Sequence, residues 1–144
     1  MKRYEIAGLQ VDMEVSGRTL RQAAPYAVPA QGAADVTLNY DRSQLVESLT
    51  QHWDAELAEY MGTGALFARH LLRHDGFQLH ASAIILEGKA YLFSAPSGTG
   101  KSTHASKWLR LFGARYLNDD KPALRLIDGV WYACGTPWSG RRMS

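Results

Sequence analysis

The sequence predicts an α/β fold in which residues 1–144 form a single domain. Three observations lead to this expectation. The length is that of one domain, and hydrophobic residues make up 46% and charged residues 21% of the chain, as in globular proteins. The spacing of apolar residues changes along the chain between strand-like alternation and a helical period. A glycine-rich segment separates one predicted strand from one predicted helix.

Charge, hydropathy and cysteine content exclude several classes of partner. The 16 basic and 14 acidic residues give a net charge of +2, which is too balanced for a nucleic-acid-binding surface. No apolar run approaches the ~20 residues of a membrane helix, and the first residues do not resemble a secretory signal. The single cysteine, Cys134, excludes an internal disulfide and favours a reducing compartment. We therefore expect a cytoplasmic protein that binds neither nucleic acid nor membrane.

Three segments are expected to follow one another: strands in residues 1–42, helical structure in 43–75, and a core around the glycine-rich segment in 76–144. In the first segment, apolar and polar residues alternate over residues 4–15 and 36–40, as in strands. In the second, apolar residues recur at helical spacing. Gly62 and Gly64 interrupt that stripe, so we expect two helices or one bent helix there.

The third segment is expected to hold hairpins and one helix. The dipeptides Glu87-Gly88 and Asp128-Gly129 are typical of tight hairpin turns, and each lies between runs of alternating residues. Strands are expected at 77–86, 89–94, 115–118, 122–127 and 130–135, and a helix at 103–112. The helix face that includes Trp108 and Phe112 is expected to pack on the sheet.

The glycine-rich segment has the features of a phosphate-binding P-loop. It reads S-G-T-G-K-S-T and lies between a predicted strand and a predicted helix. Its glycines let successive backbone N–H groups converge on an anion, and the helix N-terminus adds positive partial charge. Lys101 is expected to reach the β- and γ-phosphates of ATP, and the Ser102 hydroxyl to bind Mg²⁺. Ala95 stands where the usual motif has its first glycine. The expected phosphate-binding residues are Ser97, Gly98, Thr99, Gly100, Lys101, Ser102 and Thr103.

Two adjacent carboxylates, Asp119 and Asp120, follow the next predicted strand. The carboxyl ends of neighbouring strands in a βαβ unit meet at the ligand crevice, so one carboxylate is expected to hold Mg²⁺ through water and the other to take a proton. Adjacent side chains on an extended segment point to opposite sides, which makes the two non-equivalent. We expect Asp119 to face His80 and Asp120 to face Ser102. A lone histidine in a strand, as His80 is expected to be, is more often structural than catalytic.

The combination of motifs resembles the HPr kinase/phosphorylase family and the related phosphoenolpyruvate carboxykinases. The similar segments are L-H-A-S-A, S-G-T-G-K-S, N-D-D-K-P-A and G-T-P-W-S-G, all between residues 77 and 140. The resemblance implies a P-loop domain with a mixed β-sheet. It also implies that Asp119 is the acid/base residue at an acceptor hydroxyl, that His80 tunes its proton affinity, and that Asp120 and Ser102 serve the metal. Members of the family run well beyond residue 144, so the chain is expected to lack their C-terminal part.

The expected function is therefore that of an ATP- and Mg²⁺-dependent kinase that transfers a γ-phosphate to a hydroxyl of a protein or small molecule. The carboxykinase reaction also needs cationic residues for oxaloacetate, and the sequence offers no candidate set. The alternative from another class is a nucleotide-binding or regulatory module without catalysis. The acceptor, the choice between ATP and GTP, and the oligomeric state, a homo-oligomer included, are left open by the sequence.

Overall fold

The computed structural model describes residues 1–41, 54–94 and 100–140. In these parts the chain is α/β, with three small three-stranded sheets and three α-helices. Where the length predicts one domain, the chain forms two compact units, residues 1–74 and 75–144, which we describe one at a time. This division lies beside the expected boundary between the helical segment and the core.

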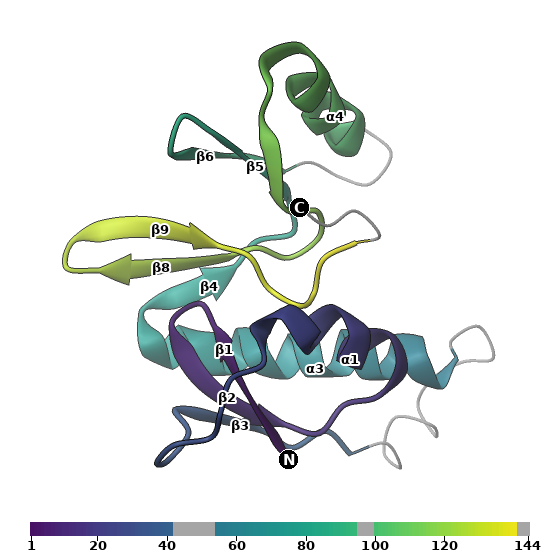
Figure 1. Ribbon diagram of the computed structural model, residues 1–144, viewed down its shortest axis with the longest axis vertical. Coiled ribbons are helices and arrows are strands. Elements are labelled where there is room, and N and C mark those ends of the chain that lie inside the picture. Colours follow the sequence, from purple (N-terminus) through teal and green to yellow (C-terminus); the bar gives the residue numbers. More distant parts are fainter. Residues whose placement is uncertain (42–53, 95–99, 141–144) are drawn as a thin grey trace. The chain divides into compact units, whose positions relative to one another are not determined.

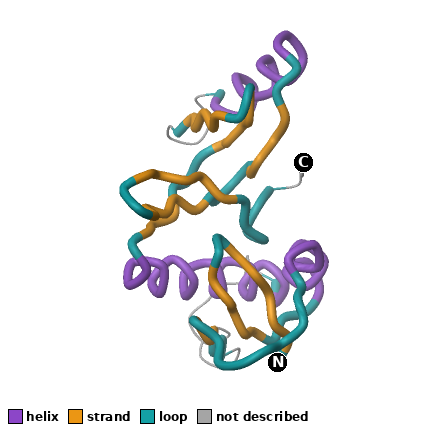
Figure 2. Tube along the Cα trace, turned by 60° about the vertical axis from the view of Figure 1, so that its left-hand side comes forward, coloured by secondary structure: helices purple, strands orange, loops and turns teal. Residues whose placement is uncertain are grey.

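In its described residues, the first unit combines one sheet with two α-helices (Figures 1 and 2). Its elements are β1 (Lys2–Ile6), β2 (Leu9–Met13), α1 (Gly17–Ala23), η1 (Ala24–Tyr26), β3 (Val36–Leu38), α3 (Ala55–Leu71) and η2 (Leu72–His74). β1 and β2 form an antiparallel hairpin, and β3 pairs with β2 in parallel. The strands expected from alternation are thus confirmed, whereas nothing in the alternation indicated α1.

A single helix, α3, runs through both Gly62 and Gly64, so of the two expected alternatives the structure excludes two separate helices. Each helical glycine costs only about 1 kcal/mol relative to alanine. Packing outweighs that cost, because Gly64, Phe67 and Leu71 are all buried. Asp54 caps the helix, since its carboxylate accepts a hydrogen bond from Leu57 N at 2.7 Å. The apolar residues expected between 43 and 53 lie outside the described residues.

The first unit also holds a buried ion pair between the hairpin strands. Arg3 is 5% exposed, and its Nε and Nη2 donate hydrogen bonds to the two carboxylate oxygens of Asp12, its cross-strand partner. The remaining guanidinium donors reach the carbonyl oxygens of Gln31 and Gly32. The guanidinium holds the pKa of the Asp12 carboxyl below its usual value.

The second unit contains two sheets and one helix (Figure 1). Its elements are β4 (Gly76–Gln78), β5 (Ser82–Leu86), β6 (Lys89–Phe93), α4 (Lys101–Phe112), β7 (Arg115–Asn118), β8 (Ala123–Ile127) and β9 (Val130–Cys134). One sheet has the order β4-β8-β9 and the other β6-β5-β7. Both predicted hairpins are confirmed, with two-residue turns in which Glu87 and Asp128 have φ of 53° and 51°, followed by glycines that also have positive φ.

The β6-β5-β7 sheet arranges its strands so that β6 and β7 run in the same direction. β5 lies between them and is antiparallel to both. All neighbouring strands in this unit are therefore antiparallel in the described residues, instead of the mixed sheet expected for the core. Because β6 and β7 run in the same direction and β5 runs against them, the carboxyl ends of β6 and β7 lie at one edge of the sheet, together with the beginning of β5.

The expected strand 77–86 is in fact two strands in two sheets. β4 pairs with β8, and β5 pairs with β6 and β7. The connection between them is tied to the opposite segment, because Leu79 N donates to Pro122 O and Ala81 N to Asp120 O. His80 therefore lies in an extended connection and not in the middle of a strand.

α4 packs on the β6-β5-β7 sheet through a small apolar core. Ala105 is buried there with Ile84, Ala114 and Tyr116, and Trp108 and Leu109 are partly buried against them. The expectation that Phe112 packs on the sheet is wrong, because its side chain is 60% exposed. Phe112 lies in the last turn of α4, and its ring instead meets the Trp108 ring at a centroid distance of 5.5 Å. In the described parts of the chain, no helix combines the length and the apolar character needed to cross a bilayer.

Candidate active site

The candidate site lies at the edge where β6 and β7 end and β5 begins. The register places Ser82 opposite Phe93 and Ala83 opposite Asn118, so the three strands reach this edge together. The P-loop motif follows β6, the two aspartates follow β7, and His80 precedes β5. The topology thus brings to one edge the three segments that the sequence analysis singled out.

Asn118 organises the turn that carries both aspartates. It is 1% exposed, and its Oδ1 accepts hydrogen bonds from the backbone N–H groups of Asp120 and Lys121, both at 2.9 Å. Its Nδ2 donates to the carbonyl oxygen and the hydroxyl of Thr136, at 3.1 and 3.2 Å. The side chain therefore fixes the backbone immediately after β7 and ties it to the segment that follows β9.

The segment after β9 completes this edge. Thr136, Trp138 and Ser139 are all buried, at 0%, 1% and 3% exposure. Thr136 Oγ1 donates to Lys121 O at 2.8 Å, and Lys121 N donates to Trp138 O at 2.9 Å. No role in the site was predicted for these residues. The available signal was the G-T-P-W-S-G motif itself, an ordered combination of small, hydroxyl and aromatic residues.

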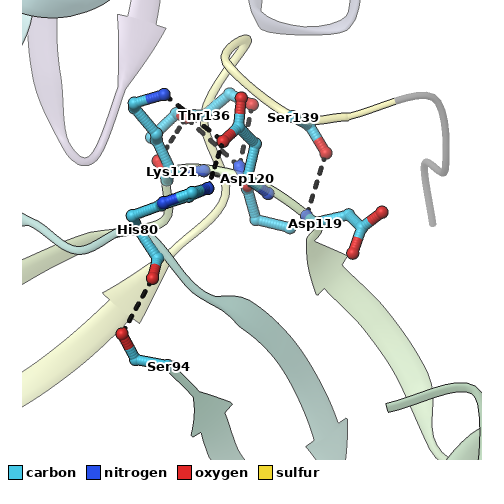
Figure 3. A network of polar contacts seen from close by, with 8 residues as sticks. His80, Ser94, Asp119, Asp120, Lys121, Thr136 and Ser139 are labelled. Carbon is cyan, nitrogen blue, oxygen red and sulfur yellow. Dashed lines mark hydrogen bonds and ion pairs between the residues drawn. The ribbon is translucent and has the colours of Figure 1, made fainter. Parts of the chain in front are cut away.

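The Asp119 side chain points away from that of Asp120 (Figure 3), so the expected non-equivalence of the two is confirmed. Asp119 Oδ1 accepts a hydrogen bond from Ser82 Oγ at 2.8 Å, and its backbone N–H donates to Ser139 Oγ at 3.2 Å. A Cβ on Gly140 would lie 3.2 Å from Asp119 Oδ2, so a glycine there leaves room for the carboxylate. The partner of the carboxylate is thus the neutral hydroxyl of Ser82.

Asp120, and not Asp119, faces His80, which corrects the expected pairing (Figure 3). His80 Nε2 lies 3.3 Å from Asp120 Oδ1, and Lys121 Nζ lies 3.3 Å from the same oxygen. The sequence predicts that the two side chains point to opposite sides, but it does not predict which of them faces His80. That choice is fixed by the Asn118 turn and by the hydrogen bond from Ala81 N to Asp120 O, which brings the His80 segment to the Asp120 side.

The segment predicted to bind phosphate is described only at its borders. Ser97, Gly98 and Thr99 lie outside the described residues, as do the side chains of Lys101 and Ser102. On the β6 side, Ser94 Oγ donates to His80 O at 2.9 Å, which ties the start of the segment to the His80 connection. On the α4 side, Gly100 precedes the helix with φ 91°, a conformation that only glycine adopts readily. Thr103 lies in the first turn of α4 and is exposed.

The chemistry of the carboxylates limits how Mg²⁺ would bind. A carboxylate oxygen is a good ligand for this cation, which usually retains several waters in nucleotide sites. Asp120 already interacts with Lys121 and His80, so it fits a role through bound water better than direct coordination. In the described residues, no group of three or more His, Cys, Asp or Glu side chains is arranged to hold a metal ion.

Comparisons with family models, curated proteins and solved structures found no match for this chain.

Proposed function

We propose that this chain binds Mg²⁺-ATP at the edge of the β6-β5-β7 sheet and is an HPr-kinase-like phosphotransferase. The observation that supports this most directly is the strand arrangement. β6 and β7 run in the same direction and are joined by α4, so the S-G-T-G-K-S-T motif and the carboxylates reach the same edge. That is where ligands bind in sheets of this kind.

In this proposal, residues 97–103 bind the phosphates of ATP. The helix N-terminus supplies N–H groups and positive partial charge, and left-handed Gly100 lets the backbone turn into α4. Lys101 would neutralise the β- and γ-phosphates. Mg²⁺ would be held by the Ser102 hydroxyl and, through water, by Asp120, and would supply charge neutralisation between the phosphates.

Asp119 is the candidate general base. Its Oδ1 accepts a hydrogen bond from the neutral Ser82 hydroxyl, which orients the carboxylate. As the acceptor oxygen bonds to the γ-phosphorus, Asp119 would take the hydroxyl proton while the bond to the β–γ bridging oxygen breaks and ADP leaves. His80 would act on Asp120, and thus on the metal side, because it contacts that carboxylate.

One observation favours the second candidate, a nucleotide-binding module without catalysis. Asp120 Oδ1 already interacts with His80 Nε2 and with the Lys121 ammonium, and a carboxylate paired with a lysine is a weaker partner for Mg²⁺. Such a module would bind ATP through residues 97–103 and would not convert it to ADP.

Thermal unfolding with and without Mg²⁺-ATP tests the binding step. A ligand that binds only the folded state raises the melting temperature, and at 100 times its Kd the stabilisation is about 2.7 kcal/mol. We expect Lys101→Ala to lose most of this shift. The matched control is Lys107→Ala, which removes an exposed lysine from the same helix. No shift in the wild type, or equal shifts in the wild type and Lys101→Ala, would refute the assignment of residues 97–103.

Conversion of ATP to ADP, with and without hydroxyl acceptors, separates the kinase from the binding module. We expect Asp119→Asn to abolish transfer and to leave Mg²⁺-ATP binding nearly intact. Asp120→Asn should weaken the Mg²⁺-dependent part of binding. Asp128→Asn, in the exposed β8–β9 turn, is the control and should change neither. Binding without turnover for every acceptor would favour the module.

A further inference from the structure

Five aromatic rings form a continuous row along one side of α4 and the strand beside it. We call this row the aromatic wall; its members are Tyr91, Phe93, His104, Trp108 and Phe112. Neighbouring rings are in contact, with centroid distances of 4.6 Å for Phe93–His104, 5.1 Å for Tyr91–Trp108 and 5.5 Å for Trp108–Phe112. Three of the members are spaced four residues apart on α4 and therefore lie on one stripe of the helix.

The aromatic wall is more exposed than the packing of α4 on its sheet requires. The buried contact of that helix is made by Ala105, and Leu109, Trp108 and Phe93 are partly buried against the same core. The other three members of the wall are more open: His104 is exposed, Tyr91 is 37% exposed and Phe112 is 60% exposed. A row of exposed rings is unfavourable in water unless it covers or receives an apolar surface.

The wall and the carboxylates lie on opposite sides of β5. β6, which carries Tyr91 and Phe93, is one edge strand of the β6-β5-β7 sheet, and Asp119 follows β7, the other edge strand. Phe93 ends the strand before this segment, and His104 lies in the first turn of the helix after it, with its N–H bonded to Gly100 O. A phosphate chain held at the N-terminus of α4 would thus have acidic groups on one side and aromatic rings on the other.

The length of the wall suits a nucleotide. From Lys101 to Trp108 the helix rises about 10 Å at 1.5 Å per residue, a distance that the ribose and α-phosphate of a nucleotide can span. Aromatic side chains beside a backbone-binding site are the usual platform for a base, because every base has a π-face.

We propose that the aromatic wall stacks the nucleobase of the bound nucleotide, chiefly on His104 and Trp108. This inference rests on the proposed function, because the phosphates must be held at the N-terminus of α4. Stacking does not depend on the hydrogen-bonding edge of the base. The wall therefore selects for nucleotides over inorganic polyphosphate and does not distinguish ATP from GTP.

The test measures the affinities of Mg²⁺-ATP, Mg²⁺-GTP and inorganic tripolyphosphate by calorimetry. In the wild type we expect ATP and GTP to bind within a few-fold of each other and at least about tenfold more tightly than tripolyphosphate. Trp108→Leu, which keeps an apolar side chain, should weaken ATP about tenfold and leave tripolyphosphate within twofold. His104→Ala, at an exposed position, is a second variant that does not disturb the buried core. Trp131→Leu removes an exposed tryptophan on β9 and should change neither affinity.

Each outcome separates the inference from the proposed function. Base stacking at the wall is refuted if tripolyphosphate binds the wild type as tightly as ATP does. It is also refuted if the two wall variants weaken the binding of both ligands equally, or of neither. In each of these cases phosphate binding still stands. If the wild type binds neither ATP nor tripolyphosphate, the proposed function itself fails and the inference fails with it.

Discussion

The replacement of Asn118 by alanine should destabilise the second unit by about 3 kcal/mol. The side chain makes four hydrogen bonds, to the N–H groups of Asp120 and Lys121 and to two oxygens of Thr136. Each is worth roughly 0.5–1.5 kcal/mol net. Two of the partner groups retain a second contact, because Lys121 N also donates to Trp138 O and the Thr136 hydroxyl to Lys121 O. The loss is therefore expected between about 2 and 4 kcal/mol.

Urea unfolding followed by tryptophan fluorescence measures this loss. Three of the four tryptophans, at positions 108, 131 and 138, lie in the second unit, so the signal reports mainly on it. The matched control is Asn39→Ala at an exposed position of the first unit, which should change the free energy of unfolding by less than about 0.5 kcal/mol. A loss below about 1 kcal/mol for Asn118→Ala would show that this side chain does not hold the turn after β7.

Two further predictions concern the packing of each unit. Arg3 lowers the pKa of Asp12 below its usual value of 3.8, so the Asp12 carboxylate binds a proton more readily in the unfolded chain than in the folded one. The stability that this pair contributes is therefore present above pH 3.8 and is lost as the pH falls below it. Free energies of unfolding between pH 5 and 2 should show this loss, and Asp12→Asn should remove that part of the pH dependence; identical pH profiles would contradict it. Phe112→Ala should cost less than about 1 kcal/mol, since the side chain is 60% exposed, whereas Ile84→Ala, at 0% exposure, should cost about 2–5 kcal/mol. Urea unfolding of both variants would contradict this difference if their losses were equal.

Local sequence rules predict the hairpins of this chain well. The turns at Glu87-Gly88 and Asp128-Gly129 require positive φ at both positions, and few dipeptides tolerate that conformation. The turn geometry then determines which strands are neighbours and in which register they pair. The strands on both sides of these turns could therefore be predicted from a few residues.

Long-range pairing could not be predicted in the same way. Residues 77–86 alternate as a single strand would, yet β4 pairs with β8 and β5 with β6 and β7. The stretch contains no glycine, proline, asparagine or aspartate, and the connection at His80 is held by hydrogen bonds to the segment around Asp120. Similarly, α3 continues through its two glycines because of the tertiary packing of its buried face.

In the candidate site, too, local features could be predicted from the sequence and long-range contacts could not. The adjacency of the two aspartates indicated that they point to opposite sides, and the structure confirms it. Which of them faces His80 depends on the turn that Asn118 fixes and on the hydrogen bond from Ala81 N to Asp120 O, which brings the His80 connection beside Asp120. Ser82 and Ser139, which contact Asp119, lie far from it in sequence, so only the folded chain brings them together.

The position of β5 between β6 and β7 has a consequence for the order of folding. Ile84 pairs with Tyr91 within a short hairpin, but it also pairs with Tyr116, much farther along the chain. Closing the short loop costs less conformational entropy, so we expect the β5–β6 hairpin to form first and β7 to dock on it afterwards. Asp119, which follows β7, is held by contacts to Ser82 and to Ser139 in the segment after β9. We therefore expect the acidic part of the candidate site to form in the slower, non-local step of folding. Substitutions that delay the docking of β7 should delay the formation of this acidic part and leave the β5–β6 hairpin unchanged.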